Sequence, residues 1–370
     1  MSPVENRFLA LLVAGIWKGE VDVTPFQDGI STDWEAIYAC ACKQAVVGLV
    51  FDGIELLPPD LYPPKNLIVK WYAEVVCIER ANKMLDEALV SIFSSYKSLG
   101  IKPILLKGQG IGRIYPCPEH RQPGDIDLYF GKDYIRSKQL LQVAGIALEA
   151  EGEKHFGYTF KGVEVENHRY VACFYHPIRN RRLQKWVDRW MEEGLVKLVW
   201  DGQDLFLPLP GFNAIFLLIH SLLHFIPMGI GLRQVCDWAL LLQTYHREID
   251  WERFLYEIKR LELEEALMAF GYVAVHYLGL PASCLPSSVS VEEGARTGEF
   301  LMNDIMQGGN FGVARMECVT PAGKWSRVWH NYKVIKKRCE MLAPFWGSEA
   351  RCYPFYRTLN WLNKKRKGLN

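Results

Sequence analysis

The sequence predicts an α+β protein in which a small mixed sheet lies between N-terminal and C-terminal helical segments. Residues 67–96 have the pattern of one long amphipathic helix, and helical spacing returns from about residue 213. Between these segments, residues 102–106 and 126–130 are short apolar runs with the length of buried strands. We therefore expect three parts, namely a helical region at 1–98, a mixed core at 99–210 and a helical domain at 211–370.

The individual elements follow from local pattern along the chain. Residues 8–17 and 34–50 have the spacing of two shorter helices, and Gly100 suits the left-handed cap that ends the long helix. Beyond the second strand, residues 134–148 return to a helical pattern. The remaining expected elements are a hairpin formed by 158–160 and 163–171 and helical segments within 217–242 and 251–277.

Composition limits the classes of function. The 370 residues are 49% hydrophobic and 23% charged, which is typical of a folded chain, and a formal net charge of +1 gives no global attraction to nucleic acid or an anionic membrane. The ten cysteines include no C-x-x-C pair, so we expect reduced packing residues. The first 19 residues lack a secretory cleavage pattern, and the most apolar stretch, 212–231, contains two histidines and a proline. We therefore expect a cytoplasmic protein without a membrane partner.

The residues most informative about chemistry lie between 104 and 130. Glycines at 108, 110 and 112 follow a predicted strand, but prolines at 116, 118 and 123 leave no room for the helix that a dinucleotide-binding βαβ unit requires. Asp125 and Asp127 instead point to the same face of the second strand. Because two adjacent carboxylates repel each other, this pair favours a bound cation, and oxygen ligands suit Mg²⁺.

Three short motifs resemble a known family. They are Leu106-Lys107-Gly108, Arg121-x-x-Gly124-Asp125-Ile126-Asp127-Leu128 and Glu166-x-His168. Together they resemble the bacterial uncharacterised nucleotidyltransferases of the polymerase-β superfamily, strongly over residues 100–171 and more weakly at Gly231-Leu232-Arg233 and Asp237. In that superfamily a Gly-Ser turn precedes the D-x-D strand, whereas here the turn is Gly108-Gln109, without the serine hydroxyl.

The resemblance implies a polymerase-β-like core that transfers a nucleoside monophosphate from a nucleoside triphosphate, with ATP as the expected donor, to an acceptor hydroxyl and releases pyrophosphate. Small molecules, protein side chains and RNA ends are all compatible acceptors. It assigns catalysis and the binding of two Mg²⁺ ions to Asp125, Asp127 and Glu166. Glu164 and His168 share the strand face of Glu166, and the family pattern selects Glu166. The residues expected to contact the nucleotide are Lys107, Gly108, Gln109, Arg121 and Arg233.

Two alternatives belong to other classes of function. A non-catalytic nucleotide-binding or interaction module on the same fold is supported by the missing serine, since fold does not guarantee activity. A zinc hydrolase would use His220 and His224, which stand at i and i+4. Ser221 occupies the position of the glutamate that a metalloprotease helix needs, so we expect the two histidines to pack against the core.

Overall fold

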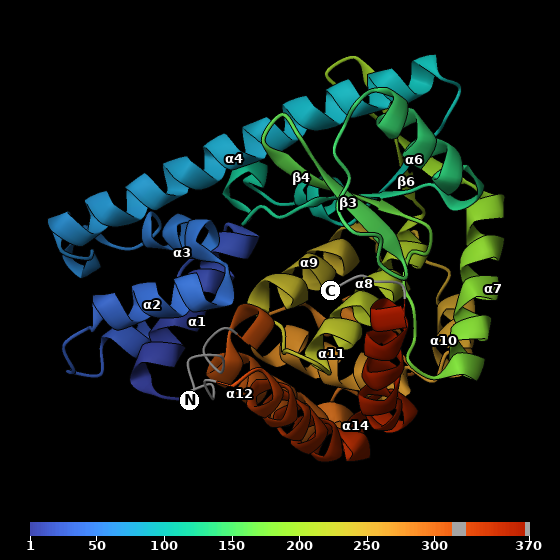
Figure 1. The fold of residues 1–370 in the computed structure, drawn as a ribbon. Helices are drawn as coiled ribbons and strands as arrows, with labels where there is room; N and C mark the ends of the chain where they lie inside the picture. Colours follow the sequence, from blue (N-terminus) through green and yellow to red (C-terminus); the bar gives the residue numbers. More distant parts are fainter. Residues whose placement is uncertain (313–322, 367–370) are drawn as a thin grey trace.

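The computed structural model describes residues 1–312 and 323–366, and most of these residues are helical (Figure 1). The helices are α1 (Pro3–Trp17), α2 (Trp34–Gln44), α3 (Val47–Ile54), α4 (Lys65–Ser98), α5 (Gly108–Gly112), α6 (Tyr134–Val143), α7 (Pro177–Glu193), α8 (Pro210–Phe225), α9 (Leu232–Tyr245), α10 (Trp251–Arg260), α11 (Glu264–His276), α12 (Ala295–Gly308) and α14 (Lys324–Arg366). The strands are β1 (Ile104–Leu106), β2 (Ile126–Tyr129), β3 (His155–Phe160), β4 (Val163–His168), β5 (Leu195–Trp200) and β6 (Gln203–Pro208).

The main sheet is small and mixed, as predicted. Its order is β1-β2-β4-β3, in which β2 and β4 run parallel and the other two neighbouring pairs are antiparallel. Because β1 and β2 are antiparallel, the glycine-rich segment between them cannot belong to a dinucleotide-binding βαβ unit, whose strands are parallel. The fold class expected from the sequence, a mixed sheet flanked by helices, is therefore confirmed.

The hairpin of β5 and β6 was not predicted, although its turn carries a recognisable signal. Asp201 and Gly202 connect the two strands, and their φ angles are 45° and 73°. An Asp-Gly pair with positive φ at both positions is the turn whose twist matches a two-residue hairpin. The alternating apolar residues on either side of Asp201-Gly202 were thus sufficient to predict this element.

Helix α4 connects the helical and sheet parts of the molecule, and it runs along both in Figure 1. Its 34 residues contain no glycine or proline, which explains the uninterrupted helix. Trp71 and Ile78 in its first half pack into the larger apolar cluster, whereas Leu89 and Tyr96 in its second half pack into the cluster around the sheet. One rigid helix therefore fixes the position of the sheet relative to the N-terminal helices.

The larger apolar cluster unites helices from both ends of the chain. Residues of α1 and α3 pack there with residues of α8, α9 and α11. Three expected helical segments are divided: 34–50 turns at Ala45, whose φ of 57° ends α2, 217–242 is split between α8 and α9, and 251–277 is split between α10 and α11. At each break, buried residues on both sides pack into the same apolar cluster.

Every cysteine among the described residues is a free thiol, but Cys42 and Cys77 are exposed and therefore are not the packing residues that we expected. No helix within the described residues combines the length and apolar character needed to cross a membrane.

Candidate active site

Three carboxylates meet at the parallel pair of strands in the sheet. Asp127 on β2 lies directly opposite Glu166 on β4, and Asp125 precedes β2 by one residue. One carboxylate oxygen from each of the three lies within 4.8 Å of the others, so the group can hold a metal ion. The structure therefore brings together the three residues that the sequence predicted as metal ligands.

Asp127 is the buried member of this group. Its side chain is 1% exposed; Oδ1 accepts a hydrogen bond from His168 Nε2 at 2.7 Å, and Oδ2 lies 2.7 Å from Lys107 Nζ. Burial alone would raise the pKa of Asp127, but the Lys107 charge and the His168 hydrogen bond lower it below its usual range. Both oxygens of Asp127 therefore have a partner within the chain. The three carboxylates together still fit a hard divalent cation such as Mg²⁺, which would have to displace the Lys107 ammonium from Oδ2.

The other members of the group respond to the same charges. Burial and the Asp127 carboxylate raise the pKa of Asp125. Burial opposes the charged form of Glu166, yet the His168 hydrogen bond lowers its pKa. For His168 burial favours the neutral ring, but Asp127 and Glu166 raise its pKa. The raised pKa of Asp125 thus reflects burial and the neighbouring carboxylate, the raised pKa of His168 reflects Asp127 and Glu166, and the lowered pKa of Glu166 reflects the hydrogen bond from His168.

Lys107 reaches the carboxylates because of an unusual turn after β1. Its φ is 38°, a left-handed value that is uncommon outside glycine, and Gly108 follows with φ of 50°. Two successive positive φ values reverse the chain and direct the lysine back toward β2. Burial lowers the pKa of Lys107, whereas Asp127 and Asp125 raise it and dominate. Strained backbone of this kind persists where the surroundings hold it in place, which is common at functional sites.

The carboxylates line a cavity of about 780 Å³ between the sheet and helices α8 and α9. This volume is in the range of small-molecule sites. Besides the acids, its wall includes seven cationic or imidazole side chains, namely Lys107, Arg121, Lys154, His155, His220, His224 and Arg233. The cavity can therefore accommodate an anionic ligand beside the carboxylates.

Arg121 also lines the cavity, but its guanidinium is already engaged. Nε and one terminal nitrogen contact the two oxygens of Asp237 on α9 at 2.7 and 2.8 Å, and Tyr115 donates a hydrogen bond to Asp237 at 2.6 Å. Burial raises the pKa of Asp237, but the Arg121 charge outweighs it and lowers the pKa. This buried fork ties the loop before β2 to α9, so a direct contact of Arg121 with a triphosphate would require the pair to open.

Of the other residues expected to contact the nucleotide, Arg233 and Gly108 line this cavity and Gln109 does not. Arg233 on α9 donates to the carbonyls of Gln122 and Pro123 at 3.1 and 3.2 Å, and its Nε has no partner among the described residues. Gly108 lines the cavity. Gln109 donates to Asp86 at 2.7 Å and lines a second cavity of about 420 Å³, so its side chain points away from the carboxylates.

Comparison of the sequence with known protein families identifies the family to which the chain belongs. Residues 31–279 match the model of a family described as uncharacterised nucleotidyltransferases. The chain belongs to this nucleotidyltransferase family. A solved structure described as an antigenic nucleotidyltransferase-like protein from Paracoccidioides brasiliensis shares 17% identity, with 50% of this chain and 92% of that chain covered and a TM-score of 0.33. No curated protein matches the chain.

The sequence did not predict that His220 and His224 line the cavity beside the carboxylates. His220 and His224 of α8 lie on its wall with ring centroids 4.5 Å apart, whereas we expected them to pack against the core. Burial, followed by the Lys107 charge, lowers the pKa of both, to about 3 for His224. Their polar rings at i and i+4 on an otherwise apolar helix were the available signal. Within the described residues, no three-residue group of potential metal ligands includes either of them, so the structure gives the zinc-hydrolase alternative no third ligand.

His155 is a further histidine at this site, and it lies beside Glu166. Its Nδ1 lies 3.1 Å from Glu166 Oε2, and burial lowers its pKa to about 4. His155, Glu166 and His168 form a second group with metal-ligand spacing that shares Glu166 with the first. The register places His155 of β3 directly opposite His168 of β4. This register follows from the two-residue turn Lys161-Gly162 of the predicted hairpin, although the expected first strand began only at residue 158.

Proposed function

We propose that this family member is a metal-dependent nucleotidyltransferase that moves a nucleoside monophosphate from a nucleoside triphosphate to an acceptor hydroxyl and releases pyrophosphate. The observation that carries the proposal is the group of Asp125, Asp127 and Glu166 on two neighbouring parallel strands at a cavity. These three carboxylates would hold two Mg²⁺ ions. When bound, the ions neutralise phosphate charge and stabilise the attacking and leaving oxygens.

The cationic residues of the cavity have distinct roles in this proposal. Lys107 and Arg233 supply positive charge for triphosphate oxygens, because both line the cavity. Arg121 acts as a positioning residue: its fork to Asp237 holds the loop that leads into Asp125. Gly108 allows the turn that brings Lys107 to the site. Gln109 would contribute through its backbone, since its side chain is bound to Asp86.

The alternative, a nucleotide-binding module without catalysis, is favoured by one observation. The ammonium of Lys107 already lies 2.7 Å from Asp127 and 3.8 Å from Asp125, so the carboxylates are partly neutralised without a metal ion. Together with the missing serine, this arrangement is compatible with a site that binds a nucleotide and does not turn it over.

Two measurements test the proposal. Calorimetry with ATP and the other nucleoside triphosphates, in Mg²⁺ and in chelator, is expected to show binding that requires Mg²⁺. Binding that chelator leaves unchanged would refute the metal assignment. Pyrophosphate release in the presence of small-molecule, peptide and RNA acceptors then separates the enzyme from the binding module, since the module binds Mg²⁺-nucleotide but releases no pyrophosphate with any acceptor.

A further inference from the structure

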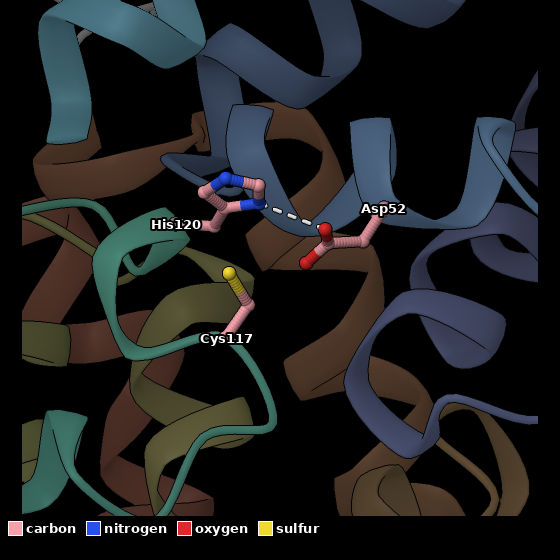
Figure 2. A group of neighbouring side chains, drawn as sticks. All are labelled: Asp52, Cys117 and His120. Carbon is pink, nitrogen blue, oxygen red and sulfur yellow. Dashed lines mark hydrogen bonds and ion pairs between the residues drawn. The ribbon is translucent and has the colours of Figure 1, made fainter.

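A second cluster of metal-ligating side chains lies outside the nucleotidyltransferase cavity. Asp52 belongs to α3, whereas Cys117 directly precedes the short 3₁₀ turn Pro118–His120 and His120 is its last residue. One ligand atom from each of the three lies within 4.8 Å of the others. Figure 2 shows the carboxylate, the sulfur and the imidazole turned toward one common space, with the His120 ring bonded to Asp52. None of the three lines the cavity with the acidic group.

We propose that Asp52, Cys117 and His120 bind a zinc-class divalent ion. A thiolate, an imidazole nitrogen and a carboxylate oxygen are the donors that Zn²⁺ takes in proteins, and a thiolate does not suit Mg²⁺. The ion would replace the thiol proton of Cys117 and the proton shared by His120 and Asp52. With three protein ligands, the fourth tetrahedral position is left for water.

The carboxylate of Asp52 gives an observation independent of the clustering. Its side chain is 2% exposed, and its Oδ2 accepts no hydrogen bond from the described residues. Oδ1, in contrast, faces His120 Nδ1 at 2.8 Å and Lys18 Nζ at 3.1 Å. A buried carboxylate oxygen without a partner is costly, and an ion between Asp52 and Cys117 would provide that partner.

The surroundings orient the imidazole in the way that metal sites use. His120 Nε2 lies 3.1 Å from Glu79 of α4, so a carboxylate holds the ring through one nitrogen and leaves Nδ1 directed at Asp52. Metal-ligating histidines commonly have such a partner on their second nitrogen. The other charged neighbours are Lys18 beside Asp52 and Glu119, whose carboxylate lies 3.7 Å from the Cys117 sulfur.

The backbone that carries two of the ligands is held firmly. Asn82 of α4 donates to the carbonyls of Glu119 and Arg121 at 2.7 and 2.8 Å. Gly48 of α3 packs so closely that a Cβ there would lie 2.3 Å from the carbonyl oxygen of His120. The ligand geometry is therefore present before any ion binds, and an ion would join α3 to the loop that continues into Arg121 and β2.

Cobalt spectroscopy on the full-length protein tests this site separately from the acidic one. After treatment with chelator and its removal, Co²⁺ is expected to produce a thiolate-to-cobalt charge-transfer band with about one equivalent bound, and Zn²⁺ should abolish the band. Cys117→Ser should eliminate it. Cys77→Ser, a change at an exposed cysteine of α4, should retain it, as should Asp127→Asn, because an all-oxygen site gives no thiolate band.

Two further variants test the geometry. Asp52→Asn keeps the side-chain volume and should weaken Co²⁺ binding, and Glu79→Ala should weaken it by about 10–100-fold through loss of the imidazole's partner. The proposal is overturned if the parent gives no thiolate band, or if Cys117→Ser keeps both the band and the affinity. Circular dichroism in chelator confirms that each variant is folded before the titration.

Discussion

Replacing Asp127 by Asn tests whether, without a metal ion, attraction from Lys107 and His168 outweighs repulsion among the three carboxylates. The change keeps the side-chain volume and removes the charge that Lys107 faces at 2.7 Å and His168 at 2.7 Å. Removal of one partner from a buried ion pair costs about 3–5 kcal/mol. Asp125 at 3.8 Å remains near Lys107, and the asparagine oxygen can still accept from His168, so we expect a loss of about 2–3 kcal/mol in the free energy of unfolding.

The measurement is urea denaturation in chelator, followed by tryptophan fluorescence. Asp125→Asn is the matched control: its side chain is 34% exposed and its ion pair with Lys107 is long, so we expect a change within about 0.5 kcal/mol. An Asp127→Asn variant that is as stable as the parent or more stable would refute this reasoning. It would mean that repulsion between the carboxylates exceeds the attraction of Lys107 and His168.

The same variant separates metal binding from a structural role. A ligand at 100 times its Kd stabilises the folded state by about 2.7 kcal/mol. Mg²⁺ with nucleotide should stabilise the parent by mass action, whereas the Asp127→Asn variant should gain little. Equal stabilisation of both proteins would show that Asp127 holds no ion.

Three further predictions follow from the site. Arg121→Ala should lower the free energy of unfolding by about 3–5 kcal/mol, since it leaves Asp237 buried without its partner, and an unchanged urea midpoint would contradict the positioning role. Arg233→Ala should leave the fold intact, as judged by circular dichroism, and weaken nucleotide binding in calorimetry; equal affinity would remove it from the site. The raised pKa of His168 means that its contribution to stability is complete below its unfolded pKa of about 6.5 and is lost as pH rises through the folded pKa. Thermal melts in chelator across this range should show that loss in the parent and not in His168→Gln.

Local patterns were sufficient to predict much of the fold and part of the site. The helical spacing of 67–96 needs no information from elsewhere in the chain, and α4 follows it from Lys65 to Ser98. The shared face of Asp125 and Asp127 is a consequence of strand geometry alone. The end of α2 at Ala45 was beyond such patterns, whereas the break between α8 and α9 carries a local signal that was missed, since Pro227, Gly229 and Gly231 lie in it.

The sequence by itself determined which side chains share a face, and the tertiary structure decided which of them meet. Glu166 reaches Asp127 through the parallel register of β2 and β4, and Arg121 pairs with Asp237, 116 residues away. His224 faces the cavity because of how α8 packs. Periodicity encodes the direction of a side chain relative to its own element. Which side chain of another element it meets depends on strand register and helix packing, and these are set by burial of apolar surface over the whole chain.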